Sequence, residues 1–301
     1  MANTDVQRIL FQHQGLSICR FRCPTGHRRW QRENQIVDGH NVAFPEVPVE
    51  IRHRGLAATL ADPNVAVLYN DGDVYQRRSL HPAGDVSNVF LFGAEYLLAA
   101  LARFDPAAEP EQPLSHRVGP VHARTFLKQR LLVARCARDP EPDEDSVLET
   151  ALEILEEVVT TAYAAPRIPA RRSDRSRAQV EAVQELLSGR HEDSLSLAEV
   201  AAEVDASVFH LCRTFKRYTG QTIHGYRRSL RLREGLFRLE KTETHLADLA
   251  LDLGFSHQSH FTEAFRREFG TTPGRVDRAF RPRRGSNSGA HRRVNLRHLP
   301  S

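Results

Sequence analysis

No stretch of this 301-residue chain approaches the ~20 consecutive apolar residues that a membrane-spanning helix needs. Its start, MANTDVQRILFQHQG, lacks the basic cluster and the following apolar segment of a secretory signal. We therefore expect a cytoplasmic protein with no membrane partner. The chain is long enough to bury the cores of two separate domains.

Cysteine is scarce and irregularly placed. Cys19, Cys23, Cys136 and Cys212 form neither a CxxC pair nor a framework of regular spacings. Scattered cysteines in a cytoplasmic chain favour reduced thiols over structural disulfides.

Catalytic motifs are also missing. The sequence has no Walker loop, no dinucleotide-binding glycine loop, no HExxH and no GxSxG. Asp71 and Asp73 flank Gly72 in the segment YNDGDVY, but carboxylates in such a segment are more often turn formers than an acid/base pair. Nothing supports catalysis, so we expect a protein that is not an enzyme and uses no cofactor.

A zinc site on a β-barrel is the alternative of a different class. Cys23 and His27, together with His40 and His53, offer the thiolate and imidazole ligands that zinc prefers. The Cys-x3-His spacing has no matched second pair, which makes ordinary turn and surface residues the better interpretation. The alternative function is therefore a metal-binding or enzymatic barrel protein whose helical half is a scaffold.

What the chain does contain changes along its length. Residues 14–92 hold short apolar runs separated by turn residues, which predicts a β-sandwich or barrel, with YNDGDVY as a hairpin turn. Residues 93–163 become helical, most clearly in SVLETALEILEEVVTTAY, whose helix is expected to pack on its own domain or on a second subunit. The polar segment AAPRIPARRSDRSR then predicts a linker.

Charge is distributed unevenly over these regions. Residues 1–165 carry 17 basic and 22 acidic side chains, whereas residues 281–301 carry six arginines and no acid. This asymmetry favours an anionic partner for the second half. The tail itself is too polar to fold alone, and either a solubilising end or a non-specific attraction to DNA would explain its arginines.

An internal repeat lies in residues 196–280. An i, i+3, i+4, i+7 apolar stripe at Leu197 recurs 49 residues later at Leu246, and Leu211 and Phe215 recur 50 residues later as Phe261 and Phe265. Each copy predicts a short helix, a turn and a longer helix, which is the helix-turn-helix arrangement.

Capping residues mark where the helices of the repeat begin. Ser196 with Glu199 forms a capping box before the first short helix. Ser207 and Ser256 are the predicted N-caps of the two longer helices.

The segment between the two copies predicts a connecting helix. From Arg213 to Arg233 there are seven basic residues and no acid. A solvated helix surface normally carries both signs, so this one-sided charge favours contact with phosphates.

These residues resemble the AraC family of bacterial transcription regulators. The resemblance covers roughly residues 176–280 and is carried by LAEVAAEVDASVFHLCRTFKRYTG, YRRSLRLREG and, most specifically, LADLALDLGFSHQSHFTEAFRREFGTTPGR. It implies a DNA-binding domain whose two recognition helices enter successive segments of the major groove, about 34 Å apart. Residues 1–165 resemble the family's cupin-like regulatory domains through ADPNVAVLYNDGDVYQRR and HPAGD.

The resemblance and the periodicity together select the candidate DNA-binding residues. With Leu211, Phe215, Phe261 and Phe265 facing inward, Arg213 is the best candidate for a bidentate contact to guanine, and Gln258 for one to adenine. The basic pairs are assigned to phosphates or solvated helix ends. The complete candidate set is Phe209, Cys212, Arg213, Lys216, Arg217, Gln258, Ser259, His260, Glu263, Arg266 and Arg267.

Two positions depart from the family pattern. Glu263 lies where the first copy has Arg213, so it either accepts from cytosine or repels the DNA backbone. Val276 and Asp277 stand where the family usually has an aromatic residue followed by arginine, which puts the packing and backbone contact of the last helix in doubt.

The sequence thus predicts an α+β protein, with an N-terminal cupin-like barrel plus helices and a C-terminal all-α domain of two helix-turn-helix units joined by a connecting helix. The expected order is a sensing and dimerisation domain at 1–165, β-rich to about 92 and helical over 93–165, a linker at 166–175, a DNA-binding domain at 176–280 and a disordered basic tail at 281–301.

The predicted function is sequence-specific transcription regulation controlled from the N-terminal domain. The expected partners are double-stranded promoter or operator DNA, a small-molecule effector, a second copy of the chain and, if the protein is an activator, RNA polymerase. When bound to DNA the protein would associate with the nucleoid. A third hypothesis is a general nucleoid-binding protein that acts through its basic tail.

Overall fold

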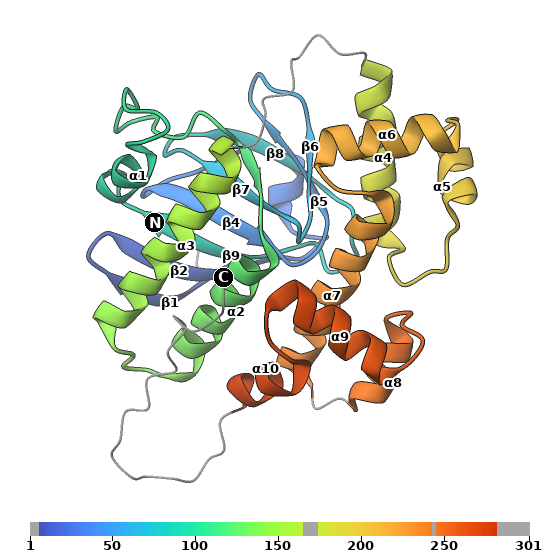
Figure 1. Ribbon diagram of the computed structural model, residues 1–301. Helices are drawn as coiled ribbons and strands as arrows, with labels where there is room; N and C mark the ends of the chain where they lie inside the picture. Colours follow the sequence, from blue (N-terminus) through green and yellow to red (C-terminus); the bar gives the residue numbers. More distant parts are fainter. Residues whose placement is uncertain (1–5, 165–173, 243–244, 282–301) are drawn as a thin grey trace. The chain divides into compact units, whose positions relative to one another are not determined.

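The computed structural model describes residues 6–164, 174–242 and 245–281 (Figure 1). It is a mixed α+β structure, β-rich at the N-terminus and helical at the C-terminus. Backbone proximity divides the chain into two compact units, residues 1–230 and residues 231–301. Most of the predicted linker, and the predicted tail beyond Arg281, lie outside the described residues.

Two antiparallel sheets form the first part of the 1–230 unit. The larger has the strand order β1 (Gln7–His13), β2 (Leu16–Cys23), β9 (Asp85–Phe92), β4 (His40–Pro45), β7 (Val65–Tyr69), β10 (Val118–Pro120). The smaller has the order β3 (Asn34–Gln35), β8 (Val74–Ser79), β5 (Val49–His53), β6 (Thr59–Ala61). A short 3₁₀ helix, η1 (Arg28–Gln31), lies between β2 and β3.

The core between the sheets follows from alternation along the strands. In β5, Val49, Ile51 and His53 are buried while Arg52 points outward. Residues from both sheets join them in one cluster, for example Phe21 of β2 and Tyr75 of β8. This shared apolar core holds the two sheets face to face.

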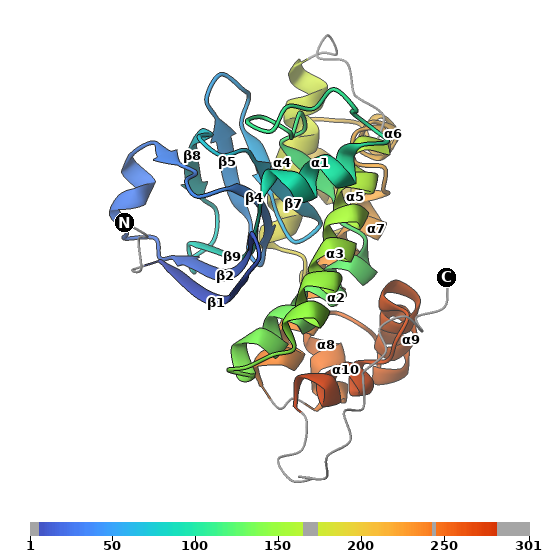
Figure 2. The same ribbon diagram turned by 90° about the vertical axis from the view of Figure 1, so that its left-hand side faces the viewer.

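Helices cover the outer face of the larger sheet. They are α1 (Ala94–Leu101), α2 (Ala123–Arg138) and α3 (Glu144–Ala164) (Figure 2). On this face Phe44 of β4 packs edge-on against Phe90 of β9, with 5.6 Å between ring centroids, and Asn88 of β9 donates to Gln129 of α2 at 3.0 Å. The outer face of the large sheet is therefore a second buried layer.

Helix α3 packs on its own domain, which is one of the two arrangements expected from its apolar stripe. Val147, Ala151 and Val158 are each 1% exposed or less. A Cβ added to Gly119 of β10 would lie 2.6 Å from the Cβ of Ala162, so glycine permits the close approach of strand and helix. Dimerisation through this helix stays a prediction.

Two expectations about the N-terminal half were wrong. The segment YNDGDVY is not a hairpin, because β7 pairs with β4 and β10 while β8 pairs with β3 and β5, so the turn at Gly72 connects the two sheets. The region 93–163 is not purely helical, since β10 completes the edge of the large sheet. Strand β10 has only three residues, VGP, too few to show a period of two.

The first helix-turn-helix unit belongs to the same compact unit as the sheets. Asp62, in the β6–β7 loop, is 1% exposed and accepts hydrogen bonds from Ser188 of α4 (Asp174–Gly189) at 2.9 Å and from the Tyr226 hydroxyl of α7 (Ile223–Lys241). The backbone N–H of Asn64 donates to the same carboxylate at 2.8 Å. A single buried carboxylate therefore connects the β-domain to two helices of the C-terminal half.

Candidate nucleic-acid interface

The helices of the repeat match in position and length. The first copy comprises α5 (Leu197–Glu203) and α6 (Val208–Thr219), and the second comprises α8 (Leu246–Asp252) and α9 (Gln258–Phe269). Helices α6 and α9 end at Gly220 and Gly270, whose φ angles of 74° and 76° are left-handed. The repeat predicted from the sequence is confirmed as two helix-turn-helix units.

The turns of the two copies have the same backbone conformation, with a positive φ followed by a hydrogen bond back to the short helix. Asp205 and Gly254 both have positive φ, 48° and 73° respectively. After each, a backbone N–H returns to the short helix: Ala206 donates to Ala201 at 3.0 Å, and Phe255 to Ala250 at 2.9 Å. The turns are therefore equivalent up to Phe255, and Ser256 is the extra residue of the second copy.

The inserted Ser256 shifts the cap of α9. Ser207 caps α6 as predicted, its side chain accepting from the backbone N–H of His210 at 3.3 Å. In the second copy His257 is the N-cap, and its Nδ1 accepts from the N–H of His260 at 3.1 Å. The prediction of Ser256 as N-cap was wrong because the extra residue follows the turn. The predicted capping box of α5, Ser196 with Glu199, is confirmed.

The exposed face of α6 carries the candidates of the first copy. Leu211 and Phe215 are buried at 1% and 0% exposure, as predicted. Phe209 is 76% exposed, an unusual position for a large apolar ring, and the Arg213 guanidinium lies 5.8 Å from the centre of that ring. Cys212 is half-buried, and Lys216 and Arg217 are exposed.

The exposed face of α9 carries the candidates of the second copy. Phe261 and Phe265 are fully buried, which turns the opposite side of the helix to solvent. The exposed residues are Gln258, Ser259, His260, Glu263, Arg266 and Arg267. The His260 ring is also held in place, edge-on against Phe255 at 5.3 Å and with Nδ1 3.1 Å from the Ser256 hydroxyl.

Glu263 has a partner on its own helix. Its Oε1 lies 2.7 Å from Nη2 of Arg267 one turn later, and both side chains are about 70% exposed. This geometry accounts for an acid on an otherwise basic face, because the pair neutralises one of the two adjacent arginines in the unbound protein.

Three basic residues expected to face phosphates have structural roles. Arg227 donates to the Leu195 carbonyl at 2.6 Å, and Arg231 to the Gly254 carbonyl at 3.2 Å. Arg233 is only 2% exposed and lies 3.8 Å from the carboxylate of Glu268. The expectation of a phosphate-facing run from Arg213 to Arg233 was therefore wrong for Arg233, which is buried. For Arg227 and Arg231 phosphate contact stays a prediction.

The last helix, α10 (Pro273–Phe280), packs despite its unusual sequence. Val276 and Phe280 are 2% and 5% exposed, so valine fills the buried position where the family pattern has an aromatic ring. Asp277 forms an ion pair with Arg281, which in turn donates to the Leu239 carbonyl at 2.9 Å. The doubt about the packing of this helix is thereby removed.

The alternative zinc ligands have separate roles. Cys23 is buried in the core between the sheets, and burial raises the pKa of its thiol, which disfavours the thiolate that zinc needs. His27 caps η1, and His40 Nδ1 accepts from the backbone N–H of Asp71 at 3.1 Å. Within residues 6–164, 174–242 and 245–281, no group of three or more His, Cys, Asp or Glu side chains is arranged to hold a metal. The same ranges contain no helix long and apolar enough to cross a membrane.

Comparison with known proteins found a family model, sequence relatives and solved structures that match this chain. A family model described as a helix-turn-helix domain matches residues 180–279. The right origin-binding protein of Escherichia coli (strain K12) is 40% identical over 87 residues, which cover 29% of this chain and 30% of that protein. The regulatory protein SoxS of Salmonella typhimurium (strain LT2) is 39% identical over 79 residues, which cover 26% of this chain and 74% of SoxS.

These matches differ in how much of each relative they span. The chain covers less than a third of the right origin-binding protein but most of SoxS. A structure of ToxT from Vibrio cholerae aligns over 88% of this chain and 99% of its own, with 10% identity and a TM-score of 0.35, too low to support a conclusion.

Proposed function

The chain belongs to the AraC family of bacterial transcription regulators, and we propose that it binds specific DNA sequences through α6 and α9. The observation that carries this proposal is the matched pair of helix-turn-helix units. Each unit presents a solvent-exposed helix face whose opposite side is fixed by buried aromatic or aliphatic residues. A rigid exposed helix is the element that enters a major groove.

The roles of individual residues are part of the same proposal. Arg213 and Gln258 contact base edges, because their side chains can make bidentate pairs with guanine and adenine. Lys216, Arg217, Arg266 and Arg267 contact phosphates and orient the helices. Phe209, Cys212, Ser259 and His260 supply the apolar and polar surface beside the bases, and Glu263 modulates the charge of Arg267.

Control from the N-terminal domain completes the proposed function. A small-molecule effector bound to residues 1–165 would act through its differential affinity for the arrangements that the DNA-binding units adopt. Association with a second copy, and with RNA polymerase in the case of activation, belong to the same hypothesis. Under this proposal the protein acts on the chromosome, in the cytoplasm and associated with the nucleoid.

Genome-wide mapping of the sites bound by the full chain tests the proposal. We expect discrete sites that share a motif, and deletion of residues 285–301 should leave that motif unchanged. Uniform coverage, or loss of all binding on the deletion, would instead support a general nucleoid protein acting through its tail.

Substitutions in the two helices test the residue assignments. Arg213→Ala should weaken binding to the preferred sequence by ~1–3 kcal/mol and relax base preference at one position. Lys216→Ala, one turn further along α6, is the matched control and should weaken binding to all sequences alike. Gln258→Ala should change base preference in the part of the DNA site that α9 contacts. Equal losses on specific and random DNA for Arg213→Ala would show that Arg213 contacts only phosphate.

A further inference from the structure

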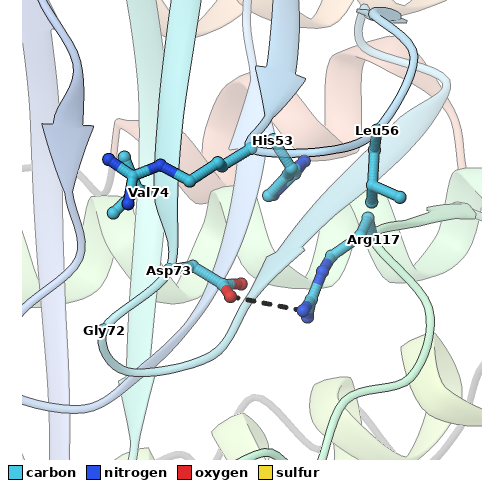
Figure 3. A pocket seen from close by; sticks show the side chains of 7 residues that line it. His53, Leu56, Gly72, Asp73, Val74 and Arg117 are labelled. Carbon is cyan, nitrogen blue, oxygen red and sulfur yellow. Dashed lines mark hydrogen bonds and ion pairs between the residues drawn. The ribbon is translucent and has the colours of Figure 1, made fainter.

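A cavity of about 340 Å³ opens at one end of the two-sheet domain, within the 1–230 unit (Figure 3). It lies where the end of β5, the turn between β7 and β8, and the segment entering β10 meet. Its size is at the lower end of the ~300–1,000 Å³ typical of small-molecule pockets. The lining residues are His53, Arg54, Leu56, Gly72, Asp73, Val74 and Arg117.

Arg117 is a fixed positive group in this cavity. Its guanidinium donates to the Leu114 carbonyl at 2.9 Å and to Oδ1 of Asp73 at 3.2 Å, and Figure 3 shows the Arg117 and Asp73 side chains facing each other. Asp73 is itself held, because its Oδ2 accepts from the backbone N–H of Asn70 at 2.8 Å. A guanidinium has five N–H donors, and these two contacts leave capacity for a further acceptor.

Arg54 lines the same cavity and has an acidic partner that a ligand can replace. Its side chain is 63% exposed and pairs with Glu33, which is 48% exposed and does not line the cavity. An exposed ion pair of this kind contributes only ~0–1 kcal/mol, so a ligand carboxylate can replace Glu33 at little cost. Two arginines and one aspartate thus line the cavity itself, which leaves an excess of positive charge.

His53 contributes a buried, neutral ring to the wall beside these arginines. It is 6% exposed, its ring centroid lies 4.9 Å from that of Tyr69, and its Nε2 is buried without a hydrogen-bond partner among the described residues. Burial, and then the charge of Arg117, lowers the pKa of His53 to about 4, so the imidazole is neutral near pH 7.

The remaining lining is apolar. Leu56, in the β5–β6 loop, is 52% exposed although it is a large aliphatic side chain, and Val74, the first residue of β8, also lines the cavity. An exposed leucine beside a charged cavity is a natural contact for the apolar part of a ligand.

We propose that this cavity binds a small organic monocarboxylate with an apolar body. The carboxylate contacts Arg117 and displaces Glu33 from Arg54, the neutral His53 ring forms part of the wall, and the apolar body lies against Leu56 and Val74. Binding of the ligand does not depend on the proposed function. Only its role as an effector rests on that function.

Titration calorimetry of the full chain tests the site without DNA. The probes are acetate, butyrate, octanoate and benzoate, with benzamide as the uncharged counterpart of benzoate. We expect affinity to increase from acetate to the larger acids, and benzamide to bind at least about tenfold more weakly than benzoate, as the loss of a charge-assisted contact implies. Failure of all four acids to bind, or equal binding of benzamide, would overturn the proposal.

Single substitutions test whether the acids bind in this cavity. Arg54→Gln and Arg117→Gln should each weaken benzoate binding about tenfold, and Asp73→Asn should strengthen it because it removes the competing carboxylate. Arg52→Gln is the matched control, since Arg52 lies on the outward face of the same strand as His53 and should bind benzoate normally. If Arg117→Gln does not fold, Arg54→Gln carries the test because Arg54 is exposed. Unchanged affinity in both Arg54→Gln and Asp73→Asn would contradict the site.

A second measurement separates this inference from the proposed function. DNA binding by the wild type is measured with and without benzoate. Binding of benzoate together with failure to bind any specific DNA would overturn the proposed function alone. Specific DNA binding by a chain that binds no carboxylate would overturn this inference alone.

Discussion

At the scale of single residues, Glu263 is an acid on the exposed, mainly basic face of α9. It neutralises Arg267 through an exposed ion pair on α9. An exposed pair of this type adds only ~0.3–0.5 kcal/mol to stability, so its main consequence is the net charge on the exposed face of α9.

Glu263→Gln should therefore increase affinity for all DNA sequences. Removal of the acid leaves Arg267 available for a phosphate, and the slope of log affinity against log salt should steepen by about one. Glu181→Gln is the control, because Glu181 forms an ion pair of the same 2.7 Å length with Arg177 on α4, outside α6 and α9. Weaker binding confined to the preferred sequence would show instead that Glu263 accepts a hydrogen bond from cytosine.

His53 makes the stability of the β-domain depend on pH. Its folded-state pKa of about 4 lies below the ordinary value of 6.5, so below pH 6.5 the unfolded chain binds a proton that the folded chain does not. The free energy of unfolding should fall as pH decreases from 6.5 to about 4, with a total loss of about 3 kcal/mol.

Urea unfolding of the wild type and of His53→Gln at pH 7 and pH 4.5 measures this effect. The variant should lose less stability between the two pH values, because glutamine does not titrate. Equal losses in both proteins would show that other groups cause the acid sensitivity.

At the scale of secondary-structure elements, the turn of the second helix-turn-helix unit requires glycine. Gly254 has a φ of 73°, and an added Cβ would lie 2.9 Å from the guanidinium of Arg231. The first copy meets the same need with Asp205, a residue type that tolerates the left-handed region better than most.

Gly254→Ala should destabilise the 231–301 unit by about 1–2 kcal/mol, as expected for a side chain forced to a positive φ. Gly274→Ala is the matched control. It lies in α10, where an added Cβ meets nothing within 4 Å, and alanine there should be neutral or stabilising by up to ~1 kcal/mol. Thermal unfolding of both variants checks the prediction, and equal midpoints would contradict it.

The helical elements were predictable because each depends on local sequence. Their apolar stripes follow the 3.6-residue period, and Ser207 and the Ser196 capping box mark where helices begin. The N-cap of α9, His257, also had a sequence signal, since the 50-residue offset that pairs Leu211 with Phe261 also pairs Ser207 with His257.

The β-elements were less predictable because strand partners are distant in sequence. Strand β7 and strand β8 are separated by a four-residue turn, yet they join different sheets. Nothing in that turn distinguishes a hairpin from a connection between sheets, because glycine with positive φ suits both. The cavity has no sequence signal for the same reason, because Arg117 is far along the chain from His53 and Asp73.

At the scale of the whole molecule, Asp62 connects the β-domain to α4 and α7, the helices that precede and follow the first helix-turn-helix unit in the chain. Its partners Ser188 and Tyr226 lie 126 and 164 residues away, which is why no sequence pattern indicated the contact. Burial and the carboxylate of Asp62 raise the pKa of Tyr226 well above its ordinary value, so the phenol remains a donor over the physiological range. This junction is a direct physical route by which the N-terminal domain can influence α7.

Tyr226→Phe should weaken the junction by about 1–3 kcal/mol, because the buried carboxylate loses one of its donors. Hydrogen exchange of α4 and of the β6–β7 loop should accelerate. Tyr218→Phe is the control, since the Tyr218 hydroxyl is buried without a partner among the described residues and its removal should cost nothing. Unchanged exchange in Tyr226→Phe would show that Asp62 does not hold the two parts together.

The central claim is that both helix-turn-helix units bind DNA specifically, and hydroxyl-radical footprinting at a mapped site tests it most directly. The wild type should protect two tracts about one helical turn apart, Arg213→Ala should lose protection in one tract, and Gln258→Ala in the other. A single protected tract, or uniform loss of both tracts in each variant, would contradict the claim.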